Sequence, residues 1–137
     1  MRAVMAPLSF GEAADKITIL TIKSEWLNDE SQLENVRREL NLLSDAFFAA
    51  ITHSAQFDVL YADLIEVNRR LWVIENAIRV CEAEQEFGED FIRLARAVYQ
   101  NNDERARLKR EINILLGSDL IEEKSYAAEG GPDGRSR

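Results

Sequence analysis

The segment from residue 60 to residue 81 carries an apolar side chain at alternating steps of four and three residues. The stripe consists of Leu60, Leu64, Val67, Leu71, Ile74, Ile78 and Cys81. Such steps keep all seven side chains on one face of an α-helix for three heptads, as in the seam of a helical bundle. A helix of this kind must bury its stripe against other helices, so the segment predicts an all-α fold.

Two helices are expected before this one. The first runs from about Phe10 to Leu27 and begins with a capping box formed by Ser9 and Glu12. Its apolar face is broad, which favours packing against more than one neighbour. After a turn at residues 28–30, a second capping box of Ser31 and Glu34 predicts another helix. That helix has a single apolar stripe and should fade between residues 52 and 56.

A fourth helix should begin near residue 88 or 89 and stop at Gly117, a typical residue just beyond a helix end. The polar segment 99–103 leaves two alternatives inside it. Asn101 and Glu104 fit a helix cap, which would split the segment into two helices. We favour one continuous helix, because no Gly or Pro forces a break.

These segments predict an antiparallel bundle of four main helices with a short C-terminal tail. We expect residues 1–8 to form a flexible arm and residues 9–126 to form a single helical domain. The segment 118–126 should be ordered and anchored by Leu120 and Ile121. Residues 127–137 are polar and rich in Gly, which predicts a disordered end.

Charge and composition exclude several classes of protein. The net charge is −8, which argues against general binding to nucleic acid or to an anionic membrane surface. No apolar run approaches the roughly 20 residues of a membrane-spanning helix, and the single cysteine cannot form an internal disulfide. We therefore expect a cytoplasmic protein from a bacterial cell, with no membrane insertion.

Catalytic and metal-binding motifs are sparse. One histidine, His53, cannot supply the paired histidines of helical di-metal sites or of common zinc sites. No glycine-rich phosphate-binding motif occurs. We expect no metal and no cofactor, we identify no catalytic residue, and a non-enzymatic role is favoured.

The most informative anomaly lies in the fourth helix. If that helix is continuous, Asn102, Arg105 and Lys109 occupy its apolar stripe before Ile112 and Leu116 resume it. Burying an unpaired cation costs several kcal/mol, so these groups need partners. The third helix offers Asn68, Trp72, Glu75 and Arg79, the first offers Asp15, Lys16 and Lys23, and Asp103 lies beside Asn102. The sequence therefore predicts a polar layer across the bundle.

Two roles are open for this layer. Its members could simply pair with one another and fix the register of the helices, as buried polar residues do in coiled coils. Alternatively, Arg79, Arg105 and Lys109 could clamp an anionic small molecule such as a carboxylate or a phosphate. The basic residues between 105 and 110 could also form a strip for RNA, although interspersed acidic residues favour a solvated helix face.

Four segments resemble a bacterial family of short proteins known only as a domain of unknown function. They are SFGEAADKITILTIK, LWVIENAIR, FIRLARAVYQNNDERARLKREINILLGS and EEKSY, and the resemblance spans residues 8 to 126. It implies a bacterial, cytoplasmic, helical protein and assigns no activity. The segments that match best contain the polar positions above together with Tyr99, so the candidate ligand-binding residues are Asp15, Lys16, Lys23, Asn68, Trp72, Glu75, Arg79, Tyr99, Asn102, Asp103, Arg105 and Lys109.

Three functions follow from these patterns. The first is a non-enzymatic interaction or scaffold module that forms a homo-oligomer or binds a protein partner. The heptads and the broad apolar face of the first helix motivate it. The second is a binding protein or enzyme for an anionic small molecule, a sugar phosphate or a nucleotide sugar, held by the interior polar layer. RNA binding is the third and the least favoured.

Overall fold

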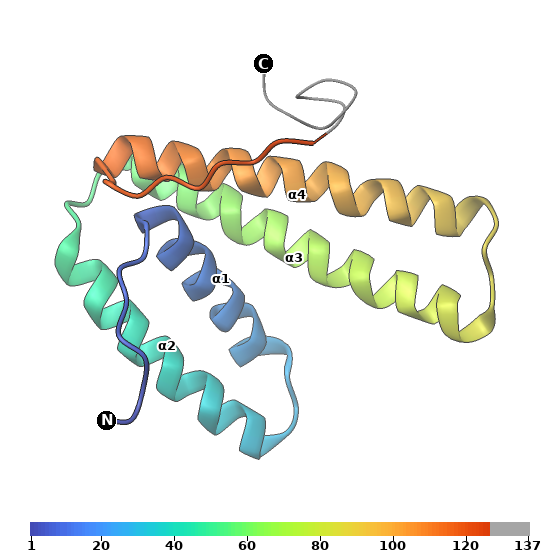
Figure 1. Ribbon diagram of the computed structural model, residues 1–137. Coiled ribbons are helices and arrows are strands. Elements are labelled where there is room, and N and C mark those ends of the chain that lie inside the picture. Colours follow the sequence, from blue (N-terminus) through green and yellow to red (C-terminus); the bar gives the residue numbers. More distant parts are fainter. Residues whose placement is uncertain (127–137) are drawn as a thin grey trace.

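The computed structural model describes residues 1–126, which fold into four α-helices (Figure 1). The helices are α1 (Phe10–Trp26), α2 (Glu30–Ala50), α3 (Ala55–Glu84) and α4 (Glu89–Leu116). Residues 1–8 contain no helix or strand. The prediction of an all-α antiparallel bundle of four helices is therefore confirmed. The expected disordered segment 127–137 lies outside the described residues.

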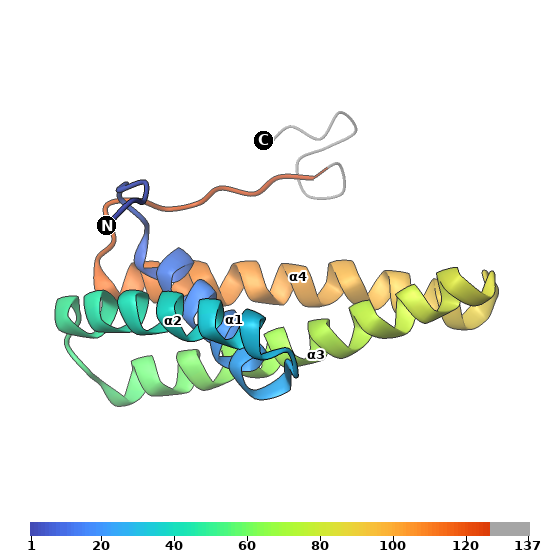
Figure 2. The ribbon, with the colours of Figure 1, turned by 90° about the horizontal axis from the view of Figure 1, so that it is seen from below.

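The bundle consists of two helical hairpins of unequal length. Helices α3 and α4 form the longer hairpin, and α1 lies between this hairpin and α2, so that α1 contacts all three other helices. The end of the α3–α4 hairpin nearest residue 88 projects beyond α1 and α2 as a two-helix arm (Figures 1 and 2). The central position of α1 explains why its apolar face is broad.

The core lies where α1 crosses the α3–α4 hairpin. Its buried apolar side chains are Ala14, Ile17, Phe47, Phe57, Leu64, Val67, Leu71, Leu108 and Ile112. Leu64, Val67 and Leu71 of the α3 stripe are buried in this core, and Leu60 packs against it half-buried. The second half of the stripe, Ile74, Ile78 and Cys81, is only half-buried, because α4 is the only helix that faces it in the arm.

The predicted ends of α1 and α4 agree with the structure to within a residue or two. Ser9 caps α1 by accepting a hydrogen bond from the backbone N–H of Glu12 at 3.1 Å. Gly117 ends α4 with a positive φ of 69°, a conformation that costs glycine little. The predicted cap at Ser31 is wrong, because Asp29 accepts from the N–H of Gln32 at 2.9 Å and α2 begins at Glu30. Aspartate caps a helix as well as serine does, so the helix begins at the earlier of the two sites.

Helix α4 runs without a break through the polar segment 99–103. Asn101 does not cap a helix there. Its Nδ2 donates to the carbonyl oxygen of Ala97 at 2.8 Å, one turn back along the same helix. The favoured alternative of one continuous helix is confirmed, and it fixes the direction of every side chain in the polar layer.

The tail at residues 118–126 lies along α4 (Figure 1). The expectation that Leu120 and Ile121 anchor it is wrong, since the two residues are 47% and 39% exposed. The tail is instead held by the charged residues 122–124, which pair with side chains of α4. Apolar anchoring failed because α1 and α3 already cover the apolar face of α4.

The N-terminal end of α1 approaches α4 very closely at Gly11. The Gly11 N–H donates to Oδ1 of the buried Asn113 at 2.6 Å. A Cβ at this position would lie 2.3 Å from the carbonyl oxygen of Lys109, so only glycine fits. This contact sets how deeply α1 sits on α4 and hence where the polar layer meets.

Candidate functional site

Asp15 is the centre of the polar layer. This α1 residue is only 1% exposed. Nε of Arg105 donates to Oδ1 of Asp15 at 2.8 Å, and Nη2 of Arg105 donates to Oδ2. Nδ2 of Asn68 donates to Oδ1 of Asp15 at 3.0 Å and to Oγ1 of Thr18 at 2.9 Å. One carboxylate therefore joins α1, α3 and α4, and the predicted inward direction of Arg105 is confirmed.

The Asp15 carboxylate compensates the charge of Arg105 in its half-buried position. Its hydrogen bonds to Asp15 raise the pKa of Arg105, while burial acts in the opposite direction and is the smaller effect. The guanidinium forks onto both carboxylate oxygens, a geometry that lysine cannot reproduce. The pair therefore fixes the relative position of α1 and α4.

Lys109 forms a second, separate ionic group. Its Nζ lies 2.8 Å from Oε2 of Glu12 and 2.8 Å from Oε2 of Glu122. Its side chain is only 11% exposed. Burial alone lowers the pKa of Lys109, but its hydrogen bonds to the two glutamates raise the pKa overall. Both interior cations of α4, Arg105 and Lys109, are thus paired. The sequence predicted one polar layer, but the structure has two separate ionic groups.

A cleft of about 460 Å³ opens beside the Asp15 group, between α1, α3 and α4. We call it the wedge cleft. It is lined by Ile19, Lys23, Asn68, Leu71, Trp72, Glu75, Asn76, Arg79, Asn102 and Arg105. Its apolar wall comes from Ile19, Leu71 and Trp72, and its other walls are amides and charged groups. This combination of an apolar wall and a few converging polar groups is typical of small-molecule sites.

The wedge cleft brings together seven of the twelve predicted site residues. These are Lys23, Asn68, Trp72, Glu75, Arg79, Asn102 and Arg105, and Asp15 lies directly behind two of them. Asn76 also lines the cleft and was missed. It lies one helical turn beyond Trp72, so the spacing of four residues could have identified it.

The other four predicted residues lie elsewhere. Lys16 is exposed on α1, and Tyr99 is 53% exposed on α4. Asp103 points to the tail, where its Oδ1 lies 2.7 Å from Nζ of Lys124. Lys109 lies beneath the tail. None of these four residues lines the wedge cleft.

The charges around the wedge cleft do not cancel completely. Arg105 is neutralised by Asp15, and Nη1 of Arg79 lies 3.5 Å from Oε2 of Glu75. Lys23, in contrast, has no ion-pair partner within residues 1–126. The cleft therefore carries one uncompensated positive charge at its α1 side.

Residues 1–126 contain no group of three or more His, Cys, Asp or Glu side chains placed to hold a metal ion. None of the helices in this range combines the length and the apolar character that crossing a bilayer needs. Among the clefts in this range, we take the wedge cleft as the candidate site because it gathers most of the predicted residues.

Comparison with known proteins places the chain in a family. A family model described as "Family of unknown function (DUF6165)" matches residues 5–133. The chain belongs to this family. The match covers all four helices, the tail and both ionic groups, and it extends slightly beyond the resemblance expected for residues 8–126. No curated protein and no solved structure matches the chain.

Proposed function

We propose that the protein binds a small anionic molecule in the wedge cleft. The observation that carries this proposal is Lys23, which lines the cleft and has no carboxylate partner among the described residues. Its neighbours in the cleft are an indole wall and three asparagines. A cation beside an aromatic wall and amide groups is suited to a molecule with one anionic group and a polar body.

The side chains suggest how such a ligand would be held. Lys23 would pair with the anionic group, and Arg79, whose 3.5 Å contact with Glu75 is long and exposed, could turn to join it. Asn76 and Asn102 offer both hydrogen-bond donors and acceptors for hydroxyl groups. The Nδ2 of Asn68 is already used by Asp15 and Thr18. A sugar phosphate matches this arrangement, with its ring against Trp72.

Binding is better supported than catalysis. Among the residues that line the wedge cleft, Glu75 is the only carboxylate, and none is a histidine, cysteine or serine. General acid–base or nucleophilic catalysis needs such a group, usually with a second group that activates it. The proposed role is therefore that of a binding protein.

Removing the Lys23 charge should weaken ligand binding without affecting the fold. We expect Lys23→Met to reduce the affinity for glucose 6-phosphate about tenfold, as loss of a charge-assisted hydrogen bond of roughly 1.5 kcal/mol implies. Quenching of the tryptophan fluorescence would follow binding, because Trp72 lines the cleft.

Lys16→Met is the matched control, since Lys16 is an exposed lysine on the same helix, seven residues away. It removes the same charge outside the cleft and should leave the affinity within about twofold, because an exposed charge is largely screened by solvent. Equal losses in the two variants, or no binding by the native chain, would refute the proposal.

Self-association remains a second candidate, supported by the projecting arm. Val73 and Val80 are more than half exposed, and their spacing of seven places them on one face of α3. Ile92 and Tyr99 are similarly exposed and similarly spaced on α4. Light scattering at tens of micromolar should show a dimer that Val80→Asp dissociates, whereas a strictly monomeric native chain would count against this candidate.

RNA binding has less support. Arg107 pairs with Glu104 and Glu111, and Arg110 pairs with Glu123. The basic residues between 105 and 110 therefore already have carboxylate partners within residues 1–126, so they do not form the uncompensated strip that phosphate backbones attract.

A further inference from the structure

Lys23 and Glu75 line the wedge cleft from different helices without pairing. Trp26 of α1 contacts Trp72 of α3, with the ring centroids 5.8 Å apart. Lys23 lies three residues before Trp26, and Glu75 lies three residues after Trp72, so each is within one helical turn of this contact. No ion pair joins the two residues within residues 1–126. The cleft therefore holds an ammonium group and a carboxylate that remain apart.

The charge of Glu75 is engaged on its own helix, in a weak contact. Its Oε2 lies 3.5 Å from Nη1 of Arg79, and the side chains of Glu75 and Arg79 are 41% and 74% exposed. Long and exposed ion pairs contribute little stability and exchange partners at small cost. When Arg79 turns to an anionic ligand, as the proposed function allows, the Glu75 carboxylate is left without a cation beside that ligand.

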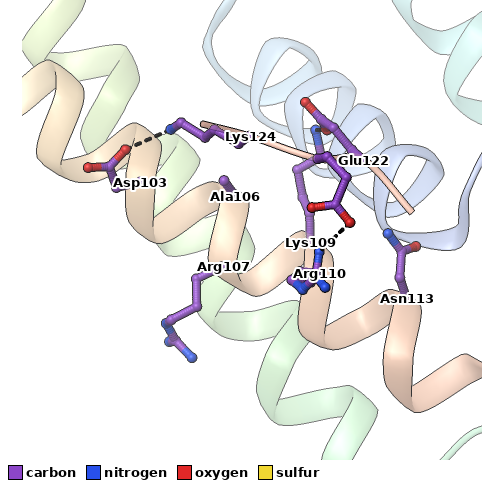
Figure 3. Close-up of a pocket in the computed structure, with 9 residues that line it drawn as sticks. Asp103, Ala106, Arg107, Lys109, Arg110, Asn113, Glu122 and Lys124 are labelled. Atoms are coloured by element: carbon purple, nitrogen blue, oxygen red, sulfur yellow. Dashed lines mark hydrogen bonds and ion pairs between the residues drawn. The ribbon is translucent and has the colours of Figure 1, made fainter. Parts of the chain in front are cut away.

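The interior cations of α4 add no surplus charge to the wedge cleft. Arg105 is paired with Asp15. Lys109 is nearly buried beneath the tail, where its Nζ pairs with Glu12 of α1 and with Glu122 of the tail. Figure 3 shows the second of these contacts. Among the described residues that line the cleft, the charges therefore leave a surplus of one positive charge, which lies on the α1 side.

A plain sugar phosphate carries more negative charge than the wedge cleft compensates. A phosphate monoester has a charge of about −1.5 to −2 at pH 7. The excess of negative charge over the single surplus cation would lie in the same cleft as the Glu75 carboxylate, and like charges placed close together disfavour binding. A ligand with one phosphate and one ammonium group has the net charge that the cleft compensates.

We infer that the wedge cleft selects an amino sugar phosphate and that Glu75 is the residue that determines this specificity. The inference rests on the proposed function and names its ligand class more closely. The phosphate would bind to Lys23 and Arg79, and the sugar ring would lie against Trp72. The ammonium group of the ligand would replace Arg79 at the Glu75 carboxylate. Each charged group of the ligand would then have a partner of opposite charge.

Two matched sugar phosphates test the inference. Glucosamine 6-phosphate differs from glucose 6-phosphate in one group, because an ammonium group replaces a hydroxyl. We expect the native chain, at pH 7 and low salt, to bind glucosamine 6-phosphate about threefold more tightly, as an exposed ion pair allows. In Glu75→Gln this preference should disappear, and the affinity for glucose 6-phosphate should rise about twofold because the like charge is gone. Tryptophan fluorescence would measure the affinities, since Trp72 lines the cleft.

Glu66→Gln is the matched control, since Glu66 is an exposed glutamate of α3 that does not line the wedge cleft. It removes the same charge and should keep the native preference for the amino sugar. The opposite effects expected for the two ligands in Glu75→Gln separate a change of specificity from a structural defect, because a defect in the cleft would weaken the binding of both.

Three results would refute the role of Glu75. They are equal affinities of the native chain for the two sugar phosphates, a preference that Glu75→Gln leaves unchanged, and weaker binding of both ligands by Glu75→Gln. If glucose 6-phosphate binding still depended on Lys23, the proposed function would stand without the inference. If the native chain bound neither sugar phosphate, both would fall.

Discussion

Gly11→Ala is expected to lower the free energy of unfolding by about 2–3 kcal/mol, because overpacking a close helix contact typically costs that much. The added Cβ would lie 2.3 Å from the carbonyl oxygen of Lys109 and 3.0 Å from Oδ1 of Asn113. The first of these atoms belongs to the backbone, so α1 itself must move away from α4. The higher helix propensity of alanine, compared with glycine, offsets only about 0.5–1 kcal/mol of this loss. Urea unfolding followed by circular dichroism would measure the difference.

Gly88→Ala is the matched control for this substitution. Gly88 precedes α4 with a φ of −85°, and nothing lies within 4 Å of an added Cβ. The only expected cost is the weaker helix-capping tendency of alanine, which is under about 1 kcal/mol. If Gly11→Ala unfolded at the same urea concentration as Gly88→Ala, α1 and α4 would not be in the close contact described.

Arg105→Met is expected to lower the free energy of unfolding by about 3 kcal/mol, since removing one partner of a buried ion pair leaves the other charge uncompensated. Asp15 would be left almost fully buried, with the Asn68 amide as its remaining side-chain donor. Adding Asp15→Asn should restore roughly 1–2 kcal/mol, because a neutral amide is less costly to bury than a carboxylate. Thermal and urea unfolding of the single and double variants would measure both effects.

Arg107→Met is the control for Arg105→Met, because it removes an exposed ion pair and not a buried one. Arg107 pairs with Glu104 and Glu111 on the same helix, and its side chain is half exposed. Exposed pairs of this kind contribute about 0–1 kcal/mol, so Arg107→Met should change the free energy of unfolding very little. Equal losses in Arg105→Met and Arg107→Met would show that the Asp15 group does not hold α1 on α4.

Much of the fold followed from the sequence because local rules and the tertiary structure agree. The stripe from Leu60 to Cys81 predicted α3, Ser9 predicted the start of α1, and Gly117 predicted the end of α4. We predicted that α4 continues through Asn101 because no Gly or Pro breaks the helix there. The second cap was missed because Asp29 and Ser31 are equally good caps, and local rules do not choose between them.

Other features depend on distances between elements that no local pattern contains. Nothing in the sequence shows that α1 and α2 are too short to cover the far half of the α3–α4 hairpin. The tail was expected to anchor through Leu120 and Ile121, but the apolar face of α4 is already covered, so charged residues hold it instead. Hydrophobicity alone does not reveal whether a binding surface is still free.

The candidate site was foreseen in part. The interrupted stripe of α4 correctly indicated that Asn102, Arg105 and Lys109 face the interior. The sequence merged two ionic groups into one layer, because helical spacing gives the face of a residue and not its partner. Lys109 is separated from the wedge cleft by its pairing with Glu12 and Glu122, and the second of these lies in the irregular tail. Lys16 was included for its position on α1, yet it faces solvent.

The central claim is that the wedge cleft binds a small anionic molecule. The most direct measurement is a titration with glucose 6-phosphate followed by nuclear magnetic resonance of the side-chain N–H groups of Trp72, Asn76 and Asn102. Saturable shifts at these three residues, absent from exposed asparagines of α2 such as Asn35 and Asn41, are the expected result. Shifts that fall on the α2 asparagines instead, or no saturable shift at any side chain, would contradict the claim.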